Sequence, residues 1–369
     1  MQHVLGLDTR MLENTGIGTY LRGLLDGFRS ADLQKKSNLT LFGPTSFSVW
    51  PRHHFSAPIY SIHEQVLYPS MLKQCRLWHA PHYNVPLAKG KTKLVVTIHD
   101  IIHWIFRDKF YSPLQSFYSG FMLRKAVTLA DQIIAVSKQT QKDLIKHFRA
   151  DEKKITVIYE SAGEEYHELT PEQLKPAFDA ARDKYRLPDT FFLYVGLLKP
   201  HKNVLWLIRI FRKLKQQGKI RTPLVLVGRK DKKYPAGFEE LRELESTPDV
   251  LHLPKIDYNE ILTLYNQALA LIHPSIYEGF GLTLLEAMRC GTPVLTTHSS
   301  SIPEVVGDAA CRVDANAEDE MIKAIIRLEK DPAFRESLRL KGLAHSQLFS
   351  WKETAKQTAA VYEKALASR

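Results

Sequence analysis

The chain has 369 residues, of which 44% are hydrophobic and 25% are charged, as expected for a folded soluble protein. This length is comfortable for two α/β domains, and no apolar run is long enough to span a bilayer. The net charge of +11 suits an anionic membrane surface, but no zinc-finger spacing, aromatic RNA-binding signature or long basic arm is present, so we expect no nucleic-acid partner. Charge interrupts the amino-terminal residues too early for a signal peptide, and we therefore expect a cytoplasmic protein.

The first half of the chain alternates short apolar runs with helical segments. Residues 4–7 predict a buried strand, and a short glycine loop at Gly16 and Gly18 then leads into a helix over 19–30. Further strands are expected at 39–42, 77–80, 94–98, 132–136 and 155–158. These elements predict a Rossmann-like, doubly wound domain over residues 1–168.

The second half repeats this pattern after a polar stretch at 164–190, which we interpret as the domain boundary. The expected strands lie at 191–195, 224–228, 250–253, 269–273, 293–296 and 310–313, and helices are expected at 318–330, 333–348 and 351–368. These elements predict a second Rossmann-like domain over residues 187–350. Open α/β sheets bind ligands at the carboxyl ends of their strands, so two such domains facing each other predict a site in the cleft between them.

The segment 274–286 contains the most informative motif of the chain. An apolar strand ends at 273, a turn with two glycines follows, and a helix is expected over 282–290. Amides at a helix amino terminus attract phosphate, and glycines let a ligand approach the backbone. Glu278 before the turn and Glu286 two turns into the helix offer carboxylates that accept hydrogen bonds from sugar hydroxyls. The spacing of the two glutamates by itself is more typical of a loop followed by a solvated helix face than of a binding site.

A second candidate loop follows the strand at 191–195 and contains Lys202. A lysine there would neutralise phosphate and stabilise the charge that develops on a diphosphate leaving group, although loop lysines are often only solvated. Arg229 or Lys230, after the next strand, could supply a second cation.

Two features of the first half also suggest ligand contacts. His99, at the carboxyl end of the strand 94–98, could bind a sugar hydroxyl or a phosphate oxygen, or could be a packed core histidine. Residues 108–130 mix aromatic with basic side chains, which suits either a helix that lies on anionic headgroups or a helix that faces the core.

These blocks, in this order, resemble the family 4 retaining glycosyltransferases of GT-B fold, over nearly the full chain. The resemblance implies that Glu278 meets the donor sugar, Glu286 the ribose hydroxyls and Lys202 the phosphates, with His99 beside the transferred sugar. Gly16 and Gly18 would approach the phosphates. The amides that would meet the sugar and phosphates belong to Gly279, Phe280, Gly281 and Leu282. The family pattern also implies that the domain 1–168 binds the acceptor, that the domain 187–350 binds the nucleotide sugar, and that the helix 352–369 packs back on the first domain. In the family an arginine commonly accompanies the lysine, at the positions that Leu197 and His201 occupy here. Because neither residue is an arginine, Arg229 is the candidate for the second phosphate-binding cation.

The resemblance is strongest to bacterial mannosyl and rhamnosyl transferases of surface polysaccharide assembly. It implies transfer of a hexose, with GDP-mannose favoured as donor, to a glycan or lipid-linked saccharide, with retention of configuration. Peripheral contact with the inner face of the membrane would suit a lipid-linked acceptor. No Asp-x-Asp occurs in the chain, so no cofactor and no essential metal are expected. The alternatives are a nucleotide-sugar 2-epimerase of the same fold and a catalytically inactive carbohydrate-binding protein.

Overall fold

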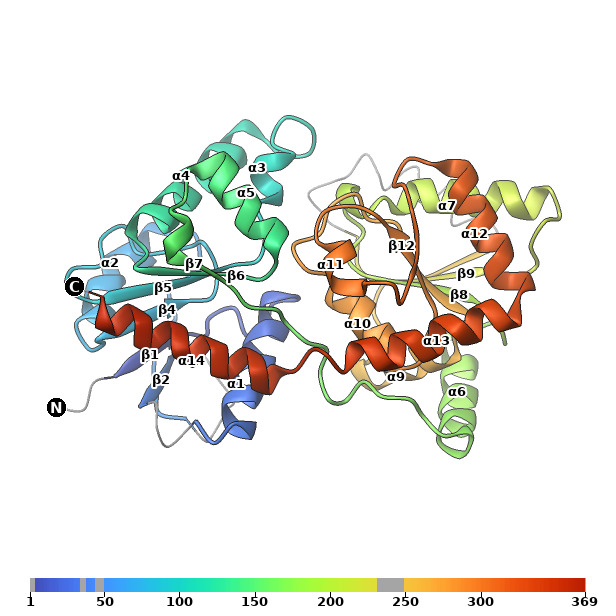
Figure 1. Ribbon diagram of the computed structural model, residues 1–369, viewed down its shortest axis with the longest axis horizontal. Helices are drawn as coiled ribbons and strands as arrows, with labels where there is room; N and C mark the ends of the chain where they lie inside the picture. The colour runs from blue at the N-terminus through green and yellow to red at the C-terminus, as the bar shows by residue number, and fades with distance from the viewer. Residues whose placement is uncertain (1–3, 34–37, 44–49, 231–248, 369) are drawn as a thin grey trace. The chain divides into compact units, whose positions relative to one another are not determined.

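A computed structural model of the chain describes residues 4–33, 38–43, 50–230 and 249–368, which form two compact units (Figure 1). The first unit comprises Met1–Ser161 together with Phe349–Arg369, and the second comprises Ala162–Leu348. Each unit contains one parallel sheet whose strands alternate with helices. The predicted fold class, α/β with two Rossmann-like domains, is confirmed.

The sheet of the first unit has the strand order β3-β2-β1-β4-β5-β6-β7, and neighbouring strands run parallel. Its strands are β1 (Leu5–Asp8), β2 (Leu39–Phe42), β3 (Arg52–His53), β4 (Leu77–Ala80), β5 (Lys93–Ile98), β6 (Gln132–Ala135) and β7 (Ile155–Val157). The chain builds outward from β1 and then returns to place β4 beside it. This reversal creates a topological switch point, where loops after the strands diverge and leave room for a ligand.

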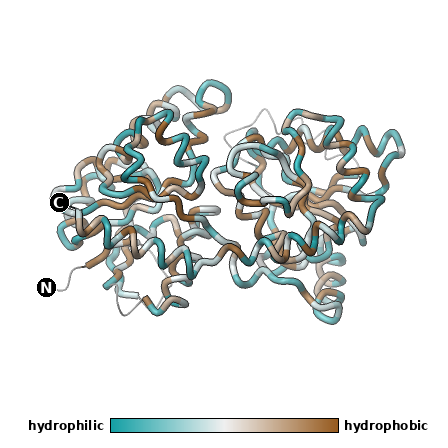
Figure 2. The backbone as a smooth tube through the Cα atoms, in the orientation of Figure 1, coloured by the Kyte–Doolittle hydropathy of each residue, from teal (hydrophilic) through white to brown (hydrophobic). Residues whose placement is uncertain are grey.

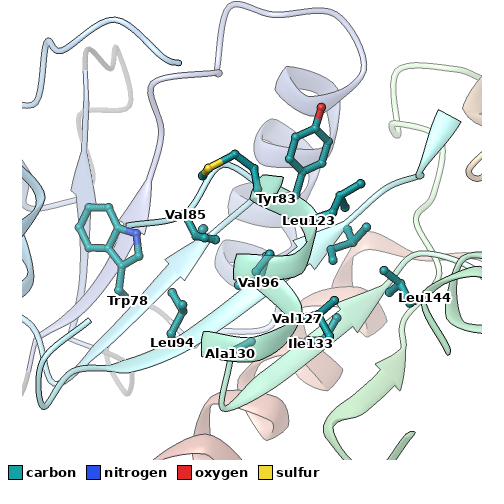
Figure 3. Close-up of a cluster of buried hydrophobic side chains, with 14 of the residues drawn as sticks. Trp78, Tyr83, Val85, Leu94, Val96, Leu123, Val127, Ala130, Ile133 and Leu144 are labelled. Atoms are coloured by element: carbon teal, nitrogen blue, oxygen red, sulfur yellow. The ribbon is translucent and has the colours of Figure 1, made fainter. Parts of the chain in front are cut away.

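Helices cover the first sheet, with bounds α1 (Ile17–Ser30), α2 (Ile62–Leu72), α3 (Ile102–Ile105), α4 (Pro113–Leu129), α5 (Lys138–Phe148) and α14 (Trp351–Ala367). Helices α2, α4 and α5 share one apolar core with the strands. In Figure 3, Leu123 and Val127 of α4 lie among Val96, Ile133 and Leu144 of this core. The continuous apolar strands therefore reflect burial under helices.

Helix α14 belongs to the first unit although it ends the chain, and it packs along α1 (Figure 1). The close approach depends on Gly23 and Gly27, one turn apart on α1. A Cβ atom at Gly23 would lie 2.1 Å from the Trp351 ring, and one at Gly27 would lie 2.1 Å from the Trp351 carbonyl oxygen. Side chains at these positions would hold the helices apart, because packed interiors leave no room for extra atoms.

The sheet of the second unit has the order β10-β9-β8-β11-β12-β13, again parallel throughout. Its strands are β8 (Phe192–Val195), β9 (Leu224–Val227), β10 (Val250–Leu253), β11 (Ala270–His273), β12 (Val294–Thr297) and β13 (Cys311–Val313). The switch point lies between β8 and β11. The two loops that the sequence analysis singled out, those after β8 and β11, therefore leave the sheet side by side.

The helices of the second unit are α6 (Pro171–Tyr185), α7 (Val204–Gln216), α9 (Tyr258–Gln267), α10 (Leu282–Arg289), α11 (Ile302–Val306), α12 (Glu318–Lys330) and α13 (Pro332–Ser346). Helix α6 occupies much of the polar stretch that the sequence indicated as a boundary, and it lies in the second unit. Its buried Phe178 stacks on Phe191. In both units the hydrophobic segments gather on the central strands and the hydrophilic segments on the outer turns (Figure 2).

Candidate functional site

The loop between β11 and α10 is shaped by Gly281, the residue that precedes the helix. Its φ of 108° falls in the left-handed region, and a Cβ atom there would lie 2.9 Å from a Leu284 methyl. Gly281, in the N-cap position, has no side chain to cap the first turn. Amides at a helix amino terminus attract anions, and this is the role that the family resemblance implies for Gly279 to Leu282.

Lys202 and Glu278 form an ion pair at the centre of the candidate site. The Lys202 Nζ atom donates to Glu278 Oε1 at 2.6 Å and to Oε2 at 2.8 Å. Both side chains are largely buried. The 3₁₀ turn Pro200–Lys202 is tied to the β11–α10 loop by a backbone hydrogen bond from Ile276 to His201. Two predicted site residues that lie 76 positions apart are thus brought into direct contact.

A buried histidine and two serines position Glu278, and the sequence analysis named none of them. The His273 Nε2 atom lies 2.7 Å from Glu278 Oε1, and Ser300 and Ser301 donate their hydroxyls to the Glu278 carbonyl oxygen. His273 ends β11, so its position at a strand's carboxyl end was the one signal that could have identified it.

Glu278 is ionised in spite of its burial. Burial by itself raises its pKa, but the charge of Lys202 and the hydrogen bond from His273 lower the pKa well below the ordinary glutamate value. Burial lowers the pKa of His273 more than Glu278 raises it. The site therefore contains a carboxylate, an ammonium group and a neutral imidazole.

Glu286 has a different environment, farther along α10. Its Oε2 accepts the hydroxyl of Tyr265 at 2.9 Å. Burial, and then the charge of Glu165, raise the pKa of Glu286 to about 7, although the Tyr265 hydrogen bond opposes the shift. Within the described residues, no hydrogen bond reaches Oε1. The two glutamates of the motif thus have separate partners and different charge states near neutral pH.

Arg229 lies beside the loop that contains Lys202, the position expected for a second phosphate-binding cation. Its backbone oxygen accepts from the Leu198 amide at 3.0 Å, and its side chain is exposed. Gly196 and Gly228 allow this close approach of the two loops, because a Cβ atom at Gly228 would lie 1.8 Å from the Gly196 carbonyl oxygen. Sequence reasoning missed this glycine pair.

In the first unit, both ring nitrogens of His99 have protein partners. Nδ1 lies 2.9 Å from Glu160 Oε1, and Nε2 lies 2.9 Å from the carbonyl oxygen of Pro81. Burial lowers the pKa of His99, but Glu160 and the Pro81 carbonyl outweigh it and the pKa is raised. His99 therefore retains a positive charge to a higher pH than an ordinary histidine, and Glu160 is a site residue that the sequence analysis did not name.

The two glycines of the first loop have different roles. Gly16 precedes α1 with a φ of 71°, and a Cβ atom there would meet nothing within 4 Å. Gly18 packs against its own loop, since a Cβ atom would lie 2.3 Å from the Leu12 carbonyl oxygen. Only Gly16 borders open space.

Within residues 4–33, 38–43, 50–230 and 249–368, no group of three or more His, Cys, Asp or Glu residues is arranged to hold a metal ion. No helix there has the length and apolar character needed to cross a membrane.

Comparisons with known proteins match both units. Residues 38–161 match the family model described as Glycosyltransferase Family 4, and residues 178–344 match Glycosyl transferases group 1. The chain is 29% identical to O-antigen chain mannosyltransferase B of Escherichia coli over 78% of this chain and 74% of that protein. It is 27% identical to the serotype-specific mannosyltransferase WbdA of Escherichia coli over 75% of this chain, and spans about a third, 34%, of that longer protein.

Solved structures share the fold. Anabaena Alr3699/HepE in complex with UDP superimposes with a TM-score of 0.75 at 20% identity, covering 98% of this chain and 100% of the other.

Proposed function

Because the chain is a glycosyltransferase of family 4 with the GT-B fold, we propose that it transfers mannose from GDP-mannose to a saccharide or lipid-linked saccharide acceptor, with retention of configuration. The relatives named as an O-antigen chain mannosyltransferase and as a serotype-specific mannosyltransferase support the choice of sugar. We place this transfer in the assembly of a surface polysaccharide. GDP is the nucleotide of the proposed donor.

The observation that carries this proposal is the contact between Lys202 and Glu278. In a nucleotide sugar, the scissile bond joins the sugar ring to the terminal phosphate. A cation for the phosphate and a carboxylate for the sugar hydroxyls must therefore lie next to each other. The pair places these two groups 2.6 Å apart, near the amino terminus of α10, whose N-cap residue Gly281 has no capping side chain.

Each group has one proposed task. Glu278 accepts hydrogen bonds from the donor sugar, and Glu286 accepts them from the ribose hydroxyls. Lys202, with Arg229 and the α10 amides, stabilises the charge that grows on the departing diphosphate. His99 contacts the transferred sugar. Because both His99 nitrogens lie within hydrogen-bond distance of protein acceptors, His99 does not act as a base, and it can donate to the sugar only if one of these hydrogen bonds opens.

The test is an assay of purified protein with GDP-mannose, GDP-rhamnose and UDP-glucose, with mannose oligosaccharides as acceptors. The expected result is mannose transfer from GDP-mannose, with an α linkage in the product by NMR. A β product would contradict retention, and free epimerised nucleotide sugar with no glycoside would indicate an epimerase. Donor binding without turnover would indicate an inactive carbohydrate-binding protein.

Peripheral membrane contact is the second part of the proposal, and α4 supports it. Leu114, Phe117 and Phe121 recur at helical spacing and are exposed, by 77% and 74% for the first two. Basic residues adjoin them: Arg124 is exposed, and the Lys125 Nζ atom lies 5.8 Å from the centre of the Phe121 ring. Apolar side chains beside cations suit an anionic bilayer surface.

Sedimentation with vesicles tests this contact. The wild type is expected to sediment with phosphatidylglycerol vesicles and less with phosphatidylcholine, whereas the triple serine variant of Leu114, Phe117 and Phe121 should stay in the supernatant. Leu340→Ser removes an exposed leucine from the second unit and should behave as wild type. Equal sedimentation of the triple variant would remove α4 from the proposal.

A further inference from the structure

His99 is fixed by contacts from four other segments of the first unit. Its ring nitrogens face Glu160, which comes after β7, and the carbonyl oxygen of Pro81, which comes after β4. The Tyr20 ring of α1 meets the imidazole edge-on, with ring centres 4.9 Å apart. Thr140 of α5 donates to the His99 backbone oxygen at 3.0 Å. The fold therefore holds both the backbone and the ring of this residue.

Sheet topology brings Glu160 to His99. The strands β5, β6 and β7 are parallel neighbours in that order (Figure 1). The carboxyl ends of parallel strands lie at the same edge of a sheet. His99 directly follows β5, and Glu160 comes shortly after β7. A segment beyond the edge strand thus supplies a partner for a histidine two strands away.

Both ring nitrogens of His99 face oxygen atoms, and this limits where protons can be. A neutral imidazole has one N–H group, and its other nitrogen is an acceptor. The Pro81 carbonyl can only accept, so Nε2 carries a hydrogen. One further proton then lies between Nδ1 and the Glu160 carboxyl, which are 2.9 Å apart. If the ring holds this proton, the pair is an imidazolium and a carboxylate.

The other titratable rings around His99 are uncharged near neutral pH. Burial, and then the charge of His99, lower the pKa of His79 to about 3 and the pKa of His82 well below its ordinary value. Burial raises the pKa of Tyr20, whose hydroxyl lies 3.0 Å from the Thr97 hydroxyl. The charge of His99 is therefore decided by its own burial and by nearby carboxylates.

Two carboxylates face His99, and the pair with Glu160 is buried. Burial lowers the pKa of His99, but the hydrogen bond and charge of Glu160, the Pro81 carbonyl and the charge of Asp100 together raise it. The Glu160 side chain is 4% exposed, and no lysine or arginine of the described residues pairs with it. A buried carboxylate is costly unless a cation accompanies it. His99 is that cation, so the shared proton belongs to the ring.

The two hydrogen bonds of the ring differ in strength. The bond to Glu160 joins opposite charges, whereas Pro81 offers a neutral carbonyl. Charge-assisted hydrogen bonds are roughly twice as strong as neutral ones. The contact with Pro81 is therefore the one that a sugar oxygen can replace. The His99 side chain is 15% exposed, which leaves part of it open to a ligand.

We propose that Glu160 is a positioning residue for the transfer reaction: it holds the Nδ1 proton of His99 and directs the Nε2–H group to the transferred sugar. The positive charge of the ring strengthens the hydrogen bond that Nε2 donates. With Nδ1 kept protonated, His99 cannot take a proton from the acceptor. Carboxylates behind catalytic or metal-bound histidines orient those rings in the same way. The assignment rests on the proposed function, because it specifies how His99 acts in that reaction.

Three variants test the proposal. Glu160→Gln retains the size of the side chain and can donate its amide to an unprotonated Nδ1, but it has no charge. Glu160→Asp retains the charge on a shorter side chain. Glu152→Gln is the matched control, because it removes an exposed glutamate from the turn just before β7.

The first measurement is NMR of protein with ¹⁵N-labelled histidine, which records the protonation of each ring nitrogen without any substrate. His99→Asn identifies the His99 signals by their loss. At pH 6.5, the ordinary pKa of histidine, most wild-type His99 rings should carry both protons, as should those of Glu160→Asp and Glu152→Gln. In Glu160→Gln most rings should be neutral and protonated at Nε2. A wild-type ring that is mainly neutral at pH 6.5, or equal titration in wild type and Glu160→Gln, overturns the proposal.

The second measurement is steady-state transfer from GDP-mannose, beside calorimetry with GDP. Glu160→Gln should lower kcat about 10- to 100-fold, by analogy with loss of the carboxylate behind a metal-bound histidine. Its GDP affinity should be unchanged, since neither Glu160 nor His99 is assigned to the nucleotide. Glu160→Asp should recover part of the turnover, and Glu152→Gln should equal the wild type.

The two measurements separate this proposal from the proposed function. Full turnover in a Glu160→Gln protein whose His99 ring has lost its charge overturns the positioning role and leaves the transferase assignment intact. If the NMR result is as expected but the wild type transfers no sugar, the proposed function fails alone. The control of His99 by Glu160 is then still supported.

Discussion

At the scale of single residues, the candidate site depends on how each charge is balanced. Glu278 is ionised because Lys202 and His273 contact it, whereas Glu286 has one hydroxyl partner and a pKa of about 7. The residue types were visible in the sequence. Their charge states follow from contacts between distant segments.

Lys202→Ala should lower turnover by on the order of 2–4 kcal/mol in barrier, because its charge is most needed when the diphosphate departs. The variant should also be less stable near neutral pH, since it leaves Glu278 ionised, buried and unpaired. Lys202→Ala combined with Glu278→Gln should recover stability but not turnover. Steady-state kinetics and urea unfolding measure the two effects.

The matched control for this experiment is Lys213→Ala, which breaks an equally short but exposed ion pair with Glu318 in the same unit. It should change stability by less than about 1 kcal/mol. If the double variant were no more stable than Lys202→Ala, the unpaired carboxylate would not be the cause of the loss.

Glu286→Ala and Glu278→Ala should affect different steps. Above pH 7, where Glu286 is ionised, its loss should weaken GDP binding by roughly 1.5–3 kcal/mol, because the ribose loses a charged acceptor. Loss of Glu278 should leave GDP affinity nearly intact and reduce turnover, since its proposed partner is the sugar. Calorimetry with GDP separates the two, and equal GDP affinity in folded Glu286→Ala would remove Glu286 from the ribose.

The raised pKa of Glu286 also predicts a pH dependence of stability. Below pH 4.5 the Glu286 carboxyl is protonated in both the folded and the unfolded chain, and above about pH 7 it is ionised in both. Between these values the unfolded chain has lost its proton and the folded chain retains it. The free energy of unfolding should therefore fall by about 3 kcal/mol from pH 4.5 to 7 because of this group.

Glu286→Gln should abolish that contribution. Its measure is the difference in urea-unfolding free energy between wild type and variant at a series of pH values. A difference that does not change with pH would show that the folded-state pKa is not raised.

At the scale of elements, packing decided what the sequence pattern left open. The segment 108–130 permitted either a core helix or a surface helix, and α4 is both. Met122 and Leu123 lie in the core, while Leu114, Phe117 and Phe121 face outward. A helix that is apolar around much of its circumference carries no periodic signal of which face is buried.

Gly27→Ala tests the packing of α14 on α1. The added methyl would lie 2.1 Å from the Trp351 carbonyl oxygen, so the helices must separate. The expected loss in unfolding free energy is roughly 1–3 kcal/mol, despite the better helix propensity of alanine. Ser30→Ala, at the exposed end of the same helix, should be neutral. A more stable Gly27→Ala would contradict the close approach.

At the scale of the whole molecule, the candidate donor site is built within the second unit, Ala162–Leu348. Family models match each unit separately. Charge stabilisation by Lys202 and helix amides predicts that activity does not need a divalent ion. Turnover should be unchanged after EDTA treatment. Loss of activity in EDTA that magnesium or manganese restores would overturn this description of the leaving group.

The sequence by itself determined the two Rossmann-like sheets and several members of the site. Short buried strands produce continuous apolar runs, and glycine turns at helix starts are local features, so both can be recognised without a structure. The motif containing Glu278 and Glu286 and the loop containing Lys202 were singled out by such local features together with the family resemblance.

Only the tertiary structure decided which residues meet. The contacts of Lys202 with Glu278 and of Glu160 with His99 join segments that lie 76 and 61 positions apart in the chain. Strand order determines these neighbours, because β8 and β11 become adjacent only when the chain crosses back at the switch point. Burial then sets the charge of each group, since the energy of a charge depends on the dielectric and the partners that the complete fold places around it.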